Sequence, residues 1–370
     1  MRSYSRHFSV CVFAALLFIH GAALGADVPF DDTAKFLAGM QLPANSPLES
    51  LTKDRGWQQH AKYLDAAWTA LEESQLSKVR SWSAKNLIQP APVLYYMFSG
   101  PDFLYADAFF PNASTYVLSG LEPAGPIPDV TRLPPQAIAI ELAAIDASLQ
   151  TVLRTSYFIT NEMSRRLFSH RLSGTLPVLY VFLARTGHTV HEVSLVTIDK
   201  DGQLNPAAEQ PAKGTPRGVK LTFSKGSGPK KTLYYFQTDL SNQGVNASGF
   251  LKFCESLGRG DALIKSASYL PHSNGFSSVR DFLLKNANSI VQDDTGIPAQ
   301  LFDRRDWELR AFGNYLRPIR IFAGLYQPML AELFRKEKAG DLDFGLGYHV
   351  KPAASNLLLA VKTMRAAATK

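Results

Sequence analysis

The sequence has few cysteines, few charged residues and no repeated pattern. Only Cys11 and Cys254 occur in 370 residues, and 19% of the residues are charged. No internal repeat, Gly-X-Y register or sustained heptad pattern is present, which excludes solenoids, collagens and coiled coils. With 46% hydrophobic residues, 23 Phe and 14 Tyr, the chain is too apolar for intrinsic disorder. The composition therefore predicts a globular protein with a large core.

Sequence motifs of high specificity are also absent. The chain contains no Gly-x-Gly-x-x-Gly loop, Walker loop, Gly-x-Ser-x-Gly elbow, His-Glu-x-x-His helix or paired Cys-x-x-Cys. This excludes the most easily recognised enzyme classes and leaves other enzymes open. The net charge of +7 is modest, and the basic residues cluster only at 225–231. We therefore expect no nucleic-acid partner, and a small molecule or an envelope component instead.

The first 25 residues have the pattern of a secretory signal peptide. Basic residues precede an apolar stretch at 8–19 that is too short to span a bilayer, and small residues at 23–25 precede a cleavage site before Ala26. We therefore expect an exported, soluble protein, periplasmic or secreted, that does not span the membrane. After cleavage Cys254 is the single cysteine, which excludes an intrachain disulfide, and its place on an apolar helical stripe predicts core packing.

Hydrophobic periodicity predicts an α/β fold in two parts after the signal peptide. Residues 26–90 have apolar positions at helical spacing and predict a helical N-terminal segment, whose tryptophans we expect in the core rather than in a carbohydrate site. In residues 91–370, apolar runs that end in turn sequences alternate with helical patterns. This alternation is typical of a mixed, largely parallel sheet flanked by helices. The runs at 93–98 and 114–121 are the strands of one βαβ unit.

Three later segments complete the predicted domain. Residues 218–237 predict an inserted β-hairpin with a basic tip, whose lysines protect an exposed edge strand. The polar, proline-containing residues 203–217 predict a surface loop. Near the end of the chain, the spacing of Leu357, Val361 and Met364 predicts a terminal helix.

Polar residues follow several predicted strands and predict a ligand crevice. The loops at 99–107, 121–129, 268–272 and 292–298 each follow a strand. Because ligands of open α/β sheets bind outside the carboxyl ends of the strands, we expect these loops to share one site. The candidate catalytic residues are Asp102, Ser268, His272 and Asp294, and the candidate ligand-binding residues are Tyr105, Asp107, Glu122, Tyr269 and Asp293.

Three functions fit these residue types. In a hydrolase, His272 acts as acid or base and Ser268 as nucleophile, which requires the two within about 3 Å of each other or of a common water. Asp102 or Asp294 is then the partner of His272 or a metal ligand. The same Asp and Ser residues also occur in ordinary turns and helix caps, where they satisfy backbone donors. In that case the crevice is a binding site with aromatic walls, or the protein is an envelope scaffold with an exposed apolar patch.

The spacing of Glu122 and Gly100 gives one hint of the fold type. Glu122 falls 22 residues after Gly100, like the acidic residue that binds the ribose in nucleotide-binding βαβ units. Because the glycine fingerprint of those units is missing, this spacing indicates a degenerate methyltransferase-like or nucleotide-type fold only. His188 and His191 have metal-ligand spacing, but we expect them to enter a strand and to point to opposite faces.

Two regions carry a family resemblance that covers about residues 92–350. They are the stretch at 96–111 and the stretch at 265–272 together with 292–298. In these regions the chain resembles an uncharacterised family of exported bacterial proteins. The resemblance implies export, and it transfers no catalytic residue, cofactor or substrate. We therefore expect an exported α/β protein with a crevice for an undetermined ligand.

Overall fold

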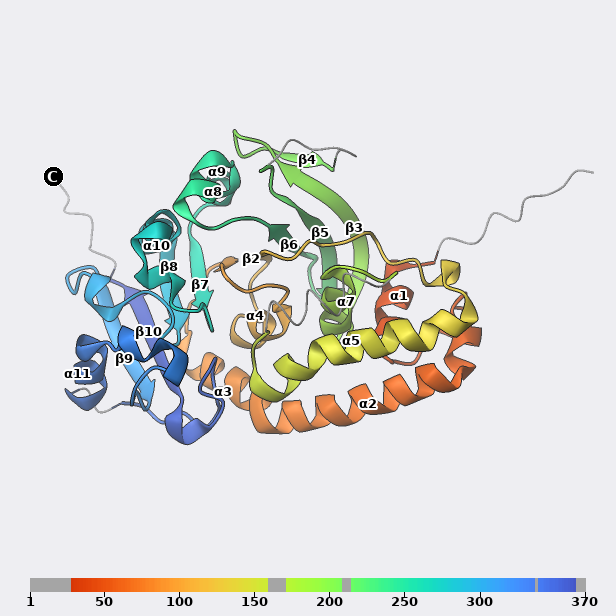
Figure 1. Ribbon diagram of the computed structural model, residues 1–370, viewed down its shortest axis with the longest axis horizontal. Helices are drawn as coiled ribbons and strands as arrows, with labels where there is room; N and C mark the ends of the chain where they lie inside the picture. Colours follow the sequence, from red (N-terminus) through yellow and green to blue (C-terminus); the bar gives the residue numbers. More distant parts are fainter. Residues whose placement is uncertain (1–27, 159–170, 208–213, 337–338, 364–370) are drawn as a thin grey trace, which may run out of the picture.

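A computed structural model describes residues 28–158, 171–207, 214–336 and 339–363 of the chain. Its centre is a ten-stranded sheet with the order β4-β3-β5-β6-β2-β1-β7-β8-β10-β9. Figure 1 shows this sheet crossing the molecule, with helices packed around it. The predicted signal peptide lies outside the described residues. The mixed α/β fold that the sequence predicts is confirmed.

The five strands at the centre of the sheet are parallel. β1 pairs in parallel with β2 and β7, β2 pairs with β6, and β7 pairs with β8. The pairs of named strands farther out are antiparallel. The central strands are β1 (Val93–Tyr96), β2 (Thr115–Gly120), β6 (Lys231–Gln237), β7 (Gly260–Ile264) and β8 (Ala287–Gln292). The outer strands are β3 (His188–Ile198), β4 (Leu204–Pro206), β5 (Arg217–Lys225), β9 (Trp307–Gly313) and β10 (Asn356–Lys362).

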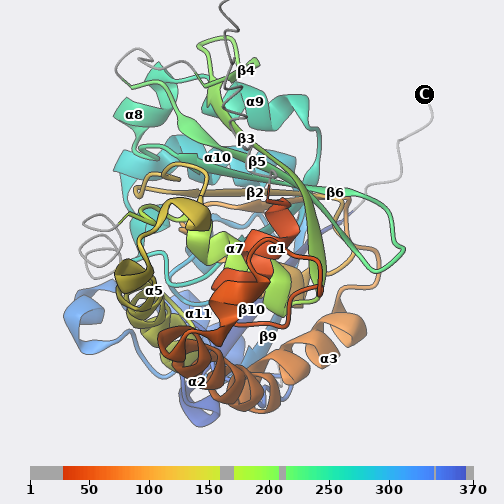
Figure 2. The same ribbon diagram turned by 90° about the vertical axis from the view of Figure 1, so that its right-hand side faces the viewer.

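Helices cover both faces of the sheet, as Figure 2 shows with the central strands seen edge-on. One face carries α1 (Phe30–Leu37), α2 (Arg55–Leu71), α3 (Ser77–Asn86), α4 (Phe103–Phe109), α5 (Pro135–Thr155) and α7 (Leu176–Arg185). The other face carries α8 (Asn242–Ala247), α9 (Phe250–Ser256) and α10 (Ser277–Asn286). A further helix, α11 (Pro328–Lys336), packs near β9.

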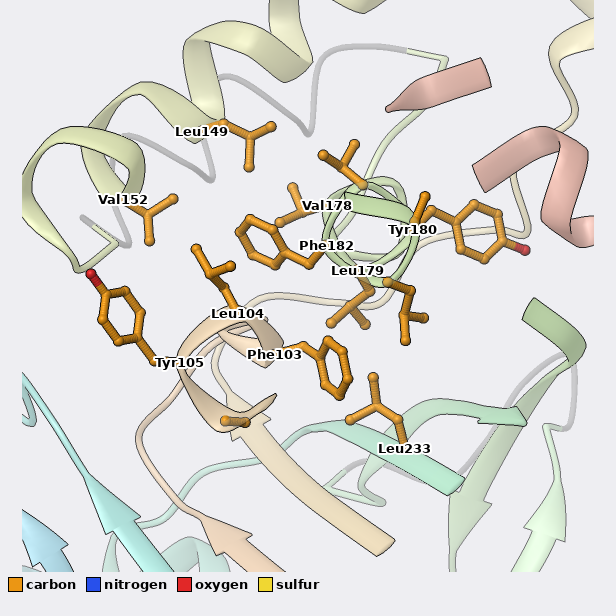
Figure 3. Packing of buried hydrophobic residues seen from close by; sticks show 14 of the residues in the cluster. Phe103, Leu104, Tyr105, Leu149, Val152, Val178, Leu179, Tyr180, Phe182 and Leu233 are labelled. Carbon is orange, nitrogen blue, oxygen red and sulfur yellow. The ribbon is translucent and has the colours of Figure 1, made fainter. Parts of the chain in front are cut away.

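The residues of β1 contribute to two hydrophobic cores, one on each face of the sheet. Leu94 and Tyr96 belong to the core that contains α4 and α7, whereas Val93 and Tyr95 belong to the core that contains α9 and α10. Because successive side chains of a strand point to opposite faces, a continuous apolar run is what a strand buried on both faces requires. Figure 3 shows the Phe182 side chain of α7 reaching between Leu149 of α5 and Leu104 of α4.

The N-terminal helices are part of the first of these cores. Trp57 and Trp82 are 9% and 7% exposed, so the core interpretation of these two tryptophans is confirmed. Among the described residues, α5 alone is long and apolar enough to cross a membrane, and 44% of its most apolar window is buried. It packs against α2 as a core helix of the fold.

Three predictions about local structure are wrong. The predicted terminal helix is β10, because the uninterrupted run Leu357–Val361 is buried on both faces between β8 and β9. The segment at 203–217 contains a short strand, β4, that pairs with β3. The predicted hairpin forms from β5 and β6, but it lies inside the sheet because β5 pairs with β3 and β6 pairs with β2. Its lysines therefore do not protect an edge strand.

Candidate functional site

The carboxyl ends of four neighbouring strands surround a cavity of about 490 Å³. The residues after β6, β2, β1 and β7 line it, together with Tyr157, Ile319, Ile321 and Tyr348. The strand order reverses at β1, because the chain continues from β1 to β2 on one side and later returns to β7 on the other. Open α/β sheets bind their ligands at this switch point, outside the carboxyl ends of the strands. The cavity is therefore the candidate functional site.

The structure divides the predicted site residues into two groups. Asp102, Glu122 and Ser268 line the cavity. The remaining residues do not contribute to its lining, and most of them are buried among protein donors: Tyr105, Asp107, Tyr269, His272, Asp293 and Asp294.

Lys265 and Asp102 form a buried ion pair at the edge of the cavity. Lys265 Nζ lies 2.9 Å from Asp102 Oδ2, and the two residues are 3% and 1% exposed. The Tyr96 hydroxyl donates to the same carboxylate at 2.7 Å. Lys265 also donates to the Ser156 carbonyl and stands over the Tyr105 ring, 4.2 Å from its centroid. Protein partners therefore satisfy both charges.

Asp102 has a second role as the N-cap of α4. Its Oδ1 accepts a hydrogen bond from the backbone N–H of Tyr105 at 3.2 Å. Nucleotide-binding βαβ units hold a pyrophosphate at the N-terminus of the corresponding helix. Here a carboxylate already occupies that position, so a phosphate would meet a like charge.

Glu122 differs from Asp102 because no ion pair joins it to a cation among the described residues. It is 3% exposed and lines the cavity at the end of β2. Gly120 leaves room for its carboxylate, since a Cβ there would lie 2.7 Å from Glu122 Oε2 and 2.9 Å from Gly100 Cα. The Tyr235 hydroxyl donates to the Glu122 carbonyl at 2.7 Å and holds this turn. A carboxylate in this setting can accept hydrogen bonds from a ligand.

Unusual backbone conformations concentrate around the same cavity. The described non-glycine residues with positive φ are Phe98, Ser156, Ser266, Ser268 and Tyr269. Phe98, Ser266 and Ser268 line the cavity, and Ser156 accepts a hydrogen bond from Lys265. Such conformations cost free energy, persist only where the surroundings fix them, and cluster at functional sites.

Asp293 and Asp294 support the loop after β7 and do not line the cavity. Asp293 Oδ2 accepts a hydrogen bond from Ser266 N at 2.9 Å. Asp294 accepts from the Tyr269 hydroxyl and from Asn356 Nδ2. Burial, with the adjacent Asp294, raises the pKa of Asp293. No group of His, Cys, Asp and Glu side chains within the described ranges could hold a metal ion, so the structure does not support a hard cation at these aspartates.

Ser268 and His272 do not form the relay that a hydrolase requires. The Ser268 and Tyr348 hydroxyls share a hydrogen bond of 2.9 Å. His272 Nε2 is buried without a hydrogen-bond partner, and the ring packs edge-on against Tyr269. Burial lowers the pKa of His272. The backbone turns sharply between the two residues, because Tyr269 has φ 55° and the 3₁₀ helix η4 (Leu270–His272) follows at once.

Asp107 forms a separate buried pair with His188 on α4 and β3. His188 Nε2 lies 3.5 Å from Asp107 Oδ1. Burial raises the pKa of Asp107 to about 6 and lowers the pKa of His188 to about 3. His191, by contrast, is exposed and hydrogen-bonds Ser224. The two histidines therefore do not face a common ligand. This agrees with their predicted place in a strand, where they point to opposite faces.

Sequence reasoning missed Lys265, Ser266 and Tyr348 as cavity residues. Lys265 directly follows the apolar run of β7, where a charged residue within a buried stretch signals a paired partner. Asp102 follows the neighbouring strand β1, so opposite charges at adjacent strand ends were the available signal. Tyr348 gives no such signal, because it lies more than 80 positions after β7 in the sequence and only the fold brings it to the site.

The fold and the site together define an α/β protein with a cavity at the switch point of a central parallel sheet. Comparisons of the chain with family models, with curated proteins and with solved structures found no match. The residues of the cavity are therefore the basis of the function proposed below.

Proposed function

We propose that this chain is an exported protein that binds an unphosphorylated nucleoside in the switch-point cavity. The observation that carries the proposal is the Glu122 carboxylate, which is buried, lines the cavity and forms no ion pair with a cation in the described part of the chain. At this place in a nucleotide-binding fold, an acidic residue accepts hydrogen bonds from the ribose hydroxyls. A volume of about 490 Å³ is in the range of small-molecule sites.

The surroundings of Glu122 support a nucleoside in particular. Gly120 lets the carboxylate pack against the backbone at the end of β2, because a Cβ there would lie 2.7 Å from Glu122 Oε2, and both Gly100 and Gly120 line the cavity. The apolar side chains of Phe98, Leu121 and Leu240 line the same cavity and follow the neighbouring strands β1, β2 and β6. Apolar faces of this kind are suited to a planar base.

The cap of α4 argues against a phosphate on the ligand. Asp102 occupies the helix N-terminus, and Lys265, which lies beside it, is neutralised by that same carboxylate. A pyrophosphate would lose its usual partners and meet a negative charge. Nucleosides without phosphate avoid both costs.

The strand order favours one type of nucleoside-binding sheet. β10 lies between β8 and β9 and is antiparallel to both. The order β6-β2-β1-β7-β8-β10-β9 is that of methyltransferase-like sheets, in which the ligand is a nucleoside that carries a sulfonium instead of a pyrophosphate. S-adenosylmethionine is therefore a suitable probe beside adenosine. We propose binding and not hydrolysis by Ser268 and His272, because these two residues form no relay.

The proposal is tested by calorimetry and thermal shift on the full chain with adenosine, 2′-deoxyadenosine, S-adenosylmethionine and ATP. Adenosine and S-adenosylmethionine should bind and raise the unfolding midpoint. 2′-Deoxyadenosine should bind more weakly because it lacks one of the two ribose hydroxyls, and ATP should not bind. The variant Glu122→Gln should weaken adenosine binding about tenfold to a hundredfold, the range for hydrogen bonds to a charged group.

A matched variant controls for charge and folding. Glu192→Gln removes a carboxylate from the exposed face of β3 and should bind adenosine like the wild type. If no ribonucleoside binds the wild type, or if Glu122→Gln binds adenosine and 2′-deoxyadenosine as the wild type does, the proposed function is wrong.

A further inference from the structure

The segment at 316–329 exposes an unusual number of large apolar side chains. Leu316 and Ile321 are 61% and 78% exposed, and Leu325, Tyr326 and Met329 are 38%, 47% and 53% exposed. The segment runs from the end of β9 through the 3₁₀ helix η7 (Arg320–Leu325) into the start of α11. Exposed apolar groups gathered in one short segment are typical of an interaction site. We name the five side chains the 316–329 surface.

Inward-facing residues hold this segment against the fold. Tyr315 is 5% exposed, stacks on Tyr326 at 5.7 Å between ring centroids and accepts a hydrogen bond from Gln327 N. The Phe322 ring packs on Tyr269 at 4.9 Å and on Tyr348 at 6.0 Å. The surface therefore consists of side chains that project from an anchored backbone.

The charge of the segment identifies the kind of partner. Residues 314–329 contain Arg317 and Arg320 and no acidic residue. Both arginines are exposed, and neither makes an ion pair with a carboxylate in the described part of the chain. Interleaved apolar and cationic side chains are the composition that lies in the interface of an anionic bilayer, with the apolar groups among the acyl chains and the guanidinium groups at the headgroups.

We propose that the 316–329 surface docks the protein peripherally on an anionic lipid membrane. Ile319 and Ile321 belong to this segment and also line the switch-point cavity, so docking would bring the cavity to the membrane surface. The proposal depends on the apolar groups and the arginines only, and it holds whatever the cavity binds.

Flotation of the full chain with lipid vesicles tests the proposal. Wild type should float with vesicles of equal parts phosphatidylglycerol and phosphatidylcholine, should not float with pure phosphatidylcholine, and should be released by high salt. The double variant Leu325→Asp/Met329→Asp should lose at least about tenfold in vesicle binding. Both positions lie outside the cavity lining, so the variant leaves nucleoside binding unchanged. Arg317→Ser/Arg320→Ser should weaken binding about thirtyfold.

The control is a second double aspartate variant on another part of the surface. Ile88 and Ile140 are 79% and 59% exposed, so Ile88→Asp/Ile140→Asp adds the same charge at more exposed apolar positions and should float like the wild type. Equal unfolding midpoints verify that the variants fold. The proposal is overturned if the wild type does not float with anionic vesicles, or if Leu325→Asp/Met329→Asp floats as well as the control. It is likewise overturned if the surface instead joins two copies of the chain, seen as a dimer that only this variant loses.

Discussion

The ammonium of Lys265 lies 2.9 Å from the carboxylate of Asp102, at the carboxyl ends of the neighbouring strands β7 and β1. Both side chains are almost completely buried. Removing two charges from water is costly, and that cost is offset by the close pairing and by hydrogen bonds from the Tyr96 hydroxyl and to the Ser156 carbonyl, together with the backbone N–H and the ring of Tyr105. The pair thus fixes one wall of the cavity, and loss of either member leaves the other charge buried alone.

Lys265→Met should therefore destabilise the protein by about 3 to 5 kcal/mol, because it leaves the Asp102 carboxylate buried without a cation. Urea unfolding measures this loss. The double variant Lys265→Met/Asp102→Asn should recover much of it, since no unpaired charge remains. As a control, Lys285→Met breaks the exposed pair with Glu255 and should cost no more than about 1 kcal/mol. Equal losses for Lys265→Met and Lys285→Met would contradict the assigned role of the buried pair.

The central strands of the sheet were predictable because their residues allow one interpretation. The run at 93–98 is apolar at every position and ends in Ser99-Gly100-Pro101, a turn sequence that stops a strand or a helix. The run at 357–361 is equally apolar, but its length fits a strand and a helix equally well. Its partners β8 and β9 decide that it is β10, and they lie far away in the sequence.

The cavity was predictable only where local sequence determines which strands are neighbours. Asp102 and Glu122 follow the paired strands β1 and β2, so the βαβ unit alone places them at one edge of the sheet. Asp293 and Asp294 follow β8, which the actual strand order puts one strand beyond β7, and their donors Ser266 and Tyr269 hold them. Local sequence gives neither the strand order nor these long-range hydrogen bonds.

Gly120→Ala should damage both stability and nucleoside binding. The added Cβ would lie 2.7 Å from Glu122 Oε2, 2.9 Å from Gly100 Cα and 3.0 Å from the Tyr235 hydroxyl, so the Glu122 carboxylate must move. We expect a loss of about 1 to 3 kcal/mol in the free energy of unfolding and weaker adenosine binding. Gly324→Ala is the control, since its Cβ meets nothing within 4 Å. The role assigned to Gly120 is wrong if the two alanine variants behave alike.

The pair of Asp107 and His188 predicts opposite pH dependences in two variants. In Asp107→Asn, the remaining His188 has a pKa of about 3 in the folded protein and an ordinary pKa of 6.5 when unfolded. The unfolded state then binds more protons below pH 6.5, so stability should fall by about 1.4 kcal/mol per pH unit as the pH decreases toward 3.

In His188→Gln the sign is reversed. The remaining Asp107 has a pKa of about 6 when folded and an ordinary value of 3.8 when unfolded. The folded state then binds more protons, so stability should rise by about 3 kcal/mol in total as the pH falls from 6 to 3.8. In the wild type, the contributions of His188 and Asp107 to the pH dependence of stability have opposite signs. Urea unfolding at pH 7 and pH 5 measures the contrast, and parallel pH profiles of the two variants would contradict it.

Ser266 and Ser268 allow a matched test of backbone strain at the cavity. Both have positive φ, at 54° and 50°, where a side chain is unfavourable and glycine is not. The Ser266 hydroxyl has no hydrogen-bond partner among the described residues, whereas the Ser268 hydroxyl is bonded to Tyr348. Ser266→Gly therefore relieves strain without losing a hydrogen bond, while Ser268→Gly loses one. We expect Ser266→Gly to be more stable than Ser268→Gly by about 1 kcal/mol in urea unfolding. If Ser266→Gly costs as much stability as glycine does in an ordinary helix or strand, these loops are not strained, and backbone strain no longer marks the cavity as a functional site.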